Sequence, residues 1–192
     1  MSATDGASPA GTRVSNLNPA NGLTVLRIVL VPVFLVALFA DGGHSAAWRW
    51  TAFAIFAVAM ITDRIDGQIA RRYGLVTEFG KLMDPIADKA LTGAAFVGLS
   101  VLGDLPWWVT IVILGRELGI TLMRFWVINE GVIPASRGGK LKTLLQTLAL
   151  GLYIMPLPDA FHWPKVIVMG AALVVTVLTG LDYVRSLRRA PA

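Results

Sequence analysis

The sequence lacks cysteine altogether and has only two histidines among its 192 residues. The absence of cysteine excludes a disulfide, a thiolate nucleophile and a zinc–thiolate site. Charged residues are also scarce, at 15% against roughly 25% in soluble domains. The histidines, His44 and His162, lie between apolar runs and far from the acidic residues discussed below. We therefore expect neither of them to act as a catalyst.

Apolar residues are in excess, at 55% of the chain. They lie in six long runs, each near the ~20 residues that a helix needs to cross the hydrocarbon core of a bilayer. The runs cover residues 23–40, 50–70, 85–103, 106–128, 141–157 and 164–184. A chain in lipid must satisfy its own backbone hydrogen bonds, so this pattern predicts an all-α integral membrane bundle of six transmembrane helices.

The bundle is expected to form one catalytic domain over residues 23–192. Residues 1–22 are rich in small and polar residues, which predicts a disordered tail that could end in a short interfacial segment. The first apolar run could also be a cleaved signal peptide. It is longer than the usual ~7–15 apolar residues of such a peptide and is interrupted by Arg27, so we prefer a retained helix.

Basic residues predict the orientation of the bundle. The net charge is +5, and the basic residues gather in the connection after the second run, in the connection after the fourth run and in the C-terminal tail. The connections near Asp104 and Asp159 carry few. By the positive-inside rule both termini are cytoplasmic, in a multi-pass protein of the cell membrane. Because the basic residues flank apolar runs, we expect anionic lipid and phosphorylated substrates as partners, and no nucleic acid.

Four aspartates lie where the second and third runs meet. Asp63 and Asp66 are three residues apart, and Asp84 and Asp88 are four apart, so each pair shares one helix face. A connection of about a dozen residues between the pairs would turn the chain back and let the pairs face each other. Four carboxylates in a partly dry site repel unless a proton or a cation relieves them. Oxygen ligands select hard cations such as Mg²⁺, Mn²⁺ or Ca²⁺, and four carboxylates suffice for two ions about 4 Å apart.

Small residues accompany the aspartates. Gly67 follows Asp66 in a predicted helix, where glycine costs ~1 kcal/mol relative to alanine, and Ala70 keeps the same face open. Arg71 could pair with a phosphate, and Gly80 permits close approach before the second pair. A single aspartate at the end of a span is usually solvated or part of a surface ion pair. Four of them at helix-face spacing favour a functional site, because ionisable groups in a membrane are costly.

This stretch resembles the motif of the CDP-alcohol phosphotransferase family, D-x2-D-G-x2-A-R-x8-G-x3-D-x3-D, and fills every fixed position. The resemblance implies six transmembrane helices, a homodimer, two Mg²⁺ or Mn²⁺ ions and CDP-diacylglycerol as donor. It also implies the roles of the motif residues. Asp63, Asp66 and Asp84 would be metal ligands, Asp88 the general base that could also touch a metal, and Gly67, Ala70, Arg71 and Gly80 the donor-binding surface. Arg64 departs from the aromatic or small residue expected in many relatives, and we expect it to point away from the metals.

A second polar set suggests a phosphorylated acceptor. Arg116 lies inside an apolar run and must pair with Glu117, an aspartate or a bound anion. The residues predicted to bind an acceptor phosphate are Arg116, Arg124, Arg137, Lys140, Lys142 and Thr143. The alternative is that Arg116 and Glu117 only hold helices together.

The segments G-R-E-x6-R and G-K-x-K-T resemble the phosphatidylglycerophosphate synthase branch of the family, as does the start, where Asn21 and Thr24 would contact the donor and Arg27 and Pro32 follow. The implied reaction is metal-dependent transfer of a phosphatidyl group from CDP-diacylglycerol to sn-glycerol 3-phosphate, releasing CMP. Inositol phosphate is the rival acceptor. A cation transporter is a more distant alternative, since it would place its carboxylates at mid-bilayer on broken helices in paired repeats.

Overall fold

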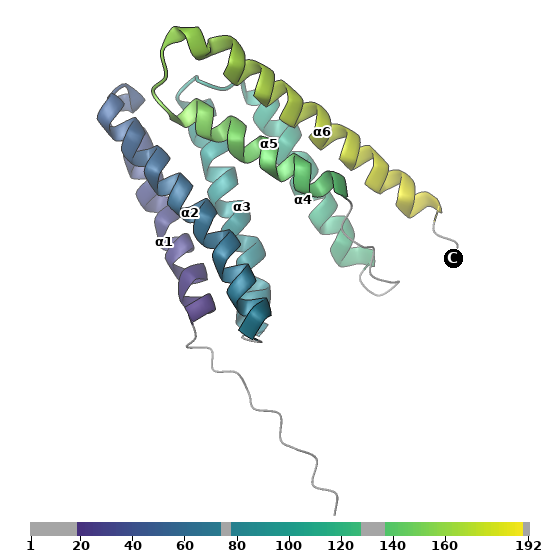
Figure 1. Cartoon of the computed structure of the whole chain (residues 1–192). Coiled ribbons are helices and arrows are strands. Elements are labelled where there is room, and N and C mark those ends of the chain that lie inside the picture. Colours follow the sequence, from purple (N-terminus) through teal and green to yellow (C-terminus); the bar gives the residue numbers. More distant parts are fainter. Residues whose placement is uncertain (1–18, 74–77, 128–136, 190–192) are drawn as a thin grey trace, which may run out of the picture.

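The computed structural model describes residues 19–73, 78–127 and 137–189. Within these ranges the side chains of residues 19–21, 64, 66–73, 78–82, 84–85, 88, 124–127, 137–138 and 187–189 lie outside the description. The described residues form α-helices and short 3-10 helices and contain no strand (Figure 1). In chain order they are α1 (Pro19–Phe39), η1 (Ala40–Gly43), α2 (Ala46–Tyr73), α3 (Glu78–Val101), α4 (Trp107–Val127), α5 (Arg137–Ile154), η2 (Asp159–Phe161) and α6 (His162–Arg189). The prediction of an all-α fold is confirmed for these residues.

The helices run up and down, so the bundle has two distinct ends (Figure 1). We call the end where α2 finishes and α3 starts the motif end; α1 and α5 begin there, and α4 and α6 finish there. The other end is called the tryptophan end, because Trp48, Trp50, Trp107, Trp108 and Trp163 all lie there, each of them exposed. This arrangement brings the start of α1 and the finish of α6 to the same end.

Helix α1 packs against both α2 and α3, while α6 packs against α4 and α5. Contacts of α5 with α2 and α3, and of α3 with α4, join these two groups. Buried residues from all six helices form one core, in which the rings of Phe34 and Phe56 lie 6.0 Å apart between centroids. On α2 the fully buried Ala52, Phe56 and Ala59 recur at helical spacing, so one stripe of this helix faces α1.

The outer surface of the bundle is also apolar. Val36, Ile111, Leu122 and Ile167 are each more than half exposed, and many other large apolar residues share this outward face. By length and composition, Gly22–Gly43 and Asp159–Ser186 are the described stretches apolar enough to cross a membrane. Water-facing helices normally carry charged residues on the side away from the core, so this inside-and-outside apolar pattern is that of a membrane protein.

The connection between α3 and α4 shows why the chain turns at the tryptophan end. Gly103 has φ +79°, a conformation that favours glycine. The amide of Asp104 donates to the carbonyl of Leu99, and the amide of Gly103 donates to that of Ser100. This pair of bonds is a Schellman motif, which satisfies the carbonyls at the end of α3. It leaves the carboxylate of Asp104 beside Arg49 of α2, with which it forms an ion pair.

Each predicted apolar run coincides with one helix, but several ends differ from the prediction. Helix α1 begins at Pro19, inside the predicted tail 1–22. Helix α2 continues to Tyr73 and α3 begins at Glu78, so the predicted connection of about a dozen residues is wrong, and the helices themselves continue through the motif. The apolar runs mark where the helices are hydrophobic and not where they end.

Candidate active site

The backbone places the two aspartate pairs level with each other. Helix α2 ends at Tyr73 and α3 starts at Glu78. At 1.5 Å of rise per residue, Asp63 and Asp88 both lie about 15 Å from this connection. Asp66 and Asp84 lie about 10 Å and about 9 Å from it. The four positions therefore form two levels on consecutive helices, as a shared carboxylate site requires.

Asp63 is the motif aspartate whose side chain the structure describes. Its Oδ1 lies 2.7 Å from Nη1 of Arg27 on α1, in an ion pair. The side chain of Arg27 is only 1% exposed, whereas that of Asp63 is 32% exposed. Helix α1 therefore contributes a buried cation to the start of the motif, and the carboxylate keeps an open side.

The predicted donor-binding residues lie on α1, α2 and α3. Thr24 is buried one turn before Arg27, on the same face of α1. Gly80 is in the first turn of α3, so its backbone is helical. The side chains of Asn21, Ala70 and Arg71, and the surroundings of Gly67 and Gly80, lie outside the described residues, as do the side chains of Asp66, Asp84 and Asp88.

A polar contact links α3 to α4 directly after the last motif aspartate. The ammonium of Lys89 donates to the hydroxyl of Thr121, which in turn donates to the carbonyl of Glu117 at 2.7 Å. Because Lys89 follows Asp88 in the chain, this contact fixes the height of α4 relative to the motif.

Glu117 is the centre of a second polar cluster. Its Oε1 accepts from Nη1 of Arg116 at 3.1 Å and from the ammonium of Lys142 on α5. Nη2 of Arg116 donates to the hydroxyl of Thr179 on α6 at 3.0 Å. The prediction that Arg116 pairs with Glu117 is confirmed, and the pair also joins three helices.

The cluster depends on a glycine of α6. A Cβ at Gly180 would lie 3.1 Å from Cγ and 3.2 Å from Nε of Arg116, which is closer than ordinary contacts allow. The arginine stem therefore lies directly against the backbone of α6. One turn further from the motif end, the buried Gln146 of α5 donates to Thr176 of α6 at 2.8 Å.

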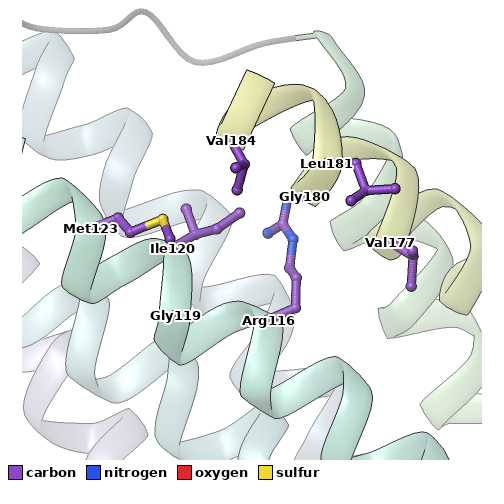
Figure 2. Close-up of a pocket in the computed structure, with 8 residues that line it drawn as sticks. All are labelled: Arg116, Gly119, Ile120, Met123, Val177, Gly180, Leu181 and Val184. Carbon is purple, nitrogen blue, oxygen red and sulfur yellow. The ribbon is translucent and has the colours of Figure 1, made fainter. Parts of the chain in front are cut away.

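Arg116 also borders a groove between α4 and α6 of about 260 Å³. Figure 2 shows the arginine rising from α4 toward Gly180, with Ile120 and Met123 to one side and Leu181 to the other. The groove wall is almost entirely apolar. Nη1 and Nη2 of Arg116 already donate hydrogen bonds to Glu117 and Thr179. The groove therefore suits an apolar group rather than a phosphate.

The predicted acceptor residues are only partly brought together. Arg116 and Lys142 share Glu117, and Lys142 is buried. Lys140 and Thr143 lie on exposed faces of α5, and the hydroxyl of Thr143 donates to the carbonyl of Gly139 at 3.1 Å. The side chains of Arg124 and Arg137 lie outside the described residues.

Sequence reasoning missed the pairing of Arg27 with Asp63 and the roles of Lys89, Thr121 and Thr179. A signal was available for Arg27, because an arginine inside an apolar run must find an anion, as was argued for Arg116. For the threonines no signal existed, since a threonine on an apolar helix usually bonds its own backbone.

The donor set fits a hard divalent cation. The motif offers carboxylate oxygens alone, and the chain has no cysteine to select a softer metal. Asp63 presents a partly open carboxylate at the right place. Among the side chains that the structure describes, no three acidic or histidine groups gather elsewhere as a competing site.

Comparison with known proteins shows the family of the chain. The model of the CDP-alcohol phosphatidyltransferase family matches residues 17–178. The chain is 61% identical over 177 residues to a probable phosphatidylglycerophosphate synthase of Mycobacterium tuberculosis H37Rv, covering 92% of this chain and 84% of the relative. It is 36% identical over 186 residues to the CDP-diacylglycerol–glycerol-3-phosphate 3-phosphatidyltransferase of Bacillus subtilis, covering 86% and 93%. The protein of the same name from Rickettsia felis is 34% identical over 177 residues, covering 90% and 96%.

Proposed function

We infer that this chain, which belongs to the CDP-alcohol phosphatidyltransferase family, transfers the phosphatidyl group of CDP-diacylglycerol to sn-glycerol 3-phosphate. The products are phosphatidylglycerophosphate and CMP. The observation that carries this inference is the complete aspartate motif at level positions of α2 and α3, in a chain whose relatives bear the name of this reaction over most of their length.

The motif residues have two roles, metal binding and donor binding. Asp63, Asp66 and Asp84 hold two divalent ions, Mg²⁺ or Mn²⁺, and Asp88 can share in this. Bound ions neutralise charge on the phosphoryl oxygens and on the leaving group. Gly67, Ala70, Arg71 and Gly80, with Asn21 and Thr24 of α1, form the surface that receives the donor.

Asp88 acts as the general base. As the acceptor hydroxyl attacks the phosphorus that carries the lipid, Asp88 takes its proton, the new oxygen–phosphorus bond forms, and the bond to CMP breaks. Positioned general bases typically contribute ~10²–10⁴-fold. No covalent enzyme intermediate is required.

The acceptor phosphate is bound by the basic groups of α4 and α5. Arg116 and Lys142 are held side by side by Glu117, which leaves this group of three with a net positive charge. A dianion is attracted to such a group more strongly than a neutral alcohol is. Arg124, Arg137, Lys140 and Thr143 are the remaining groups of this pocket.

All six helices cross the membrane, with both termini and the active site on the cytoplasmic side. The apolar outer surface supports this placement, and so do the exposed tryptophans, which suit the opposite membrane–water interface. The protein functions as a homodimer, which chemical crosslinking in membranes would test.

An acceptor panel tests the reaction. Purified protein is supplied with CDP-diacylglycerol and Mg²⁺ or Mn²⁺, and CMP is measured with glycerol 3-phosphate, inositol phosphate, inositol or serine. We expect CMP release with glycerol 3-phosphate and its loss in EDTA. Release only with inositol phosphate would reassign the acceptor, and no release with any acceptor would favour a non-enzymatic role such as cation transport.

A further inference from the structure

Arg27 is a charged residue that the proposed reaction does not yet use. It lies in the first apolar helix, its side chain is almost fully buried, and its guanidinium is 2.7 Å from Asp63. Burying an arginine among apolar helices is costly, and replacing a whole buried ion pair by apolar residues is often neutral or favourable for stability. A buried arginine placed against a motif aspartate therefore points to a role at that carboxylate.

We propose that Arg27 is a positioning residue that holds the Asp63 carboxylate in the orientation needed to ligate a divalent cation. This proposal rests on the proposed function, in which Asp63 is a metal ligand. Arg27 contacts one oxygen of Asp63 from the protein interior, while about a third of the aspartate side chain stays exposed on the other side. Groups that orient a metal ligand from behind typically change metal affinity 10–100-fold when they are removed.

The position of α1 explains how the contact works. This helix packs against both α2 and α3, so it touches both helices that carry the motif. The buried Phe34 and Leu38 anchor α1 in the core beyond Arg27. The guanidinium is thus carried by a fixed helix, and the carboxylate that contacts it is fixed in turn.

Charge alone would act in the opposite direction. A cation beside a metal ligand repels the incoming metal ion, so removing it without any loss of orientation would tighten metal binding. The two effects of Arg27 therefore have opposite signs, and the direction of the change in metal affinity separates them. We expect orientation to dominate because the pair is in direct contact.

The test is Mn²⁺ binding to the full-length protein in detergent micelles, measured by the electron paramagnetic resonance signal of free Mn²⁺ after EDTA treatment. Arg27→Met is expected to raise the Kd for Mn²⁺ about 10-fold or more. Arg27→Lys keeps the buried positive charge but loses the planar guanidinium. It is expected to raise the Kd about threefold, to a value between those of the wild type and Arg27→Met. CMP release is measured in parallel.

The matched control is Arg49→Met. Arg49 and Asp104 form a second ion pair between an arginine and an aspartate, at the tryptophan end and far from the motif. We expect this variant to shift the melting temperature but to leave the Kd for Mn²⁺ within about twofold of wild type, since its aspartate is not part of the motif.

Unchanged or tighter Mn²⁺ binding in a folded Arg27→Met protein overturns the positioning role while leaving the proposed function intact. If Arg27→Met does not fold, Arg27→Lys decides, and a Kd equal to that of wild type overturns the proposal. A wild-type protein that neither binds Mn²⁺ nor releases CMP overturns the proposed function and this inference together.

Discussion

The two ends of the bundle each hold an ion pair between an arginine and an aspartate, and α2 contributes one member to both. At the tryptophan end Arg49 of α2 pairs with Asp104 of the α3–α4 connection. At the motif end Asp63 of α2 pairs with Arg27 of α1. The two pairs are chemically alike, so their surroundings must show which of them serves the reaction.

At the tryptophan end, every polar group described below has a structural role. Asp104 follows a Schellman motif, the hydroxyls of Ser100 and Thr110 lie 2.7 Å apart, and Thr110 also bonds the carbonyl of Phe96. At the motif end Arg27 is more deeply buried than Arg49, and its partner belongs to a set of four aspartates. A costly charge that no turn or cap requires is the better sign of function.

The largest difference between the ends is expected from substitutions of aspartate by asparagine. Asp88→Asn should lower turnover about 10²–10⁴-fold, because an amide cannot take the hydroxyl proton. Mn²⁺ binding should survive. Asp104→Asn at the tryptophan end should leave turnover unchanged, and CMP release measures both. Near-normal turnover in Asp88→Asn would remove this residue from the role of base.

The next effect concerns stability at the centre of the bundle. Glu117→Gln removes the anion shared by Arg116 and Lys142, which leaves two poorly exposed cations close together. Breaking such a pair costs about 3 kcal/mol. Thermal unfolding in detergent should show a large drop in melting temperature, larger than that of Gln146→Leu, which removes only the neutral bond to Thr176. Equal drops would mean that the cluster adds no more than an ordinary hydrogen bond.

The helices and the motif positions could be predicted from the sequence, but the helix ends could not. Six apolar runs were enough to place six helices, and motif spacing was enough to place Asp63 to Asp88 on α2 and α3. Hydropathy could not place the helix ends, because residues such as Gln68, Arg71 and Arg72 interrupt an apolar run but are good helix formers. The motif helices therefore continue to Tyr73 and from Glu78.

Contacts between helices that are distant in the sequence could not be predicted either. Arg27 and Asp63 meet only because α1 packs against α2, and Lys142 meets Glu117 only because α5 approaches α4 at that height. A single sequence gives the charges that need partners but not the tertiary arrangement that chooses among them. The pair of Arg116 with Glu117 was predictable because an arginine inside an apolar run needs an anion and Glu117 is the nearest one in the sequence.

A moderate effect is expected on acceptor binding. Lys142→Met should raise the KM for glycerol 3-phosphate about 10-fold, since a hydrogen bond to a charged group contributes about 1.5–3 kcal/mol. The KM for CDP-diacylglycerol should change less. Lys140→Ala, on an exposed face of α5, should act in the same direction but by only about threefold. A larger effect from Lys140 would move the acceptor phosphate outward, and equal effects on both substrates would count against the pocket.

The smallest effect is expected at the tryptophan end. Ser100→Ala removes the hydroxyl that pairs with Thr110, but Thr110 can still donate to the carbonyl of Phe96 at 3.3 Å. No buried donor is left without an acceptor, so the loss should be about 1 kcal/mol or less. Turnover and Mn²⁺ affinity should not change, because no described contact connects this pair to the motif. If Ser100→Ala instead lowered CMP release as strongly as a motif substitution, the two ends would be coupled through α3, and the separation of a structural end from a catalytic end would fail.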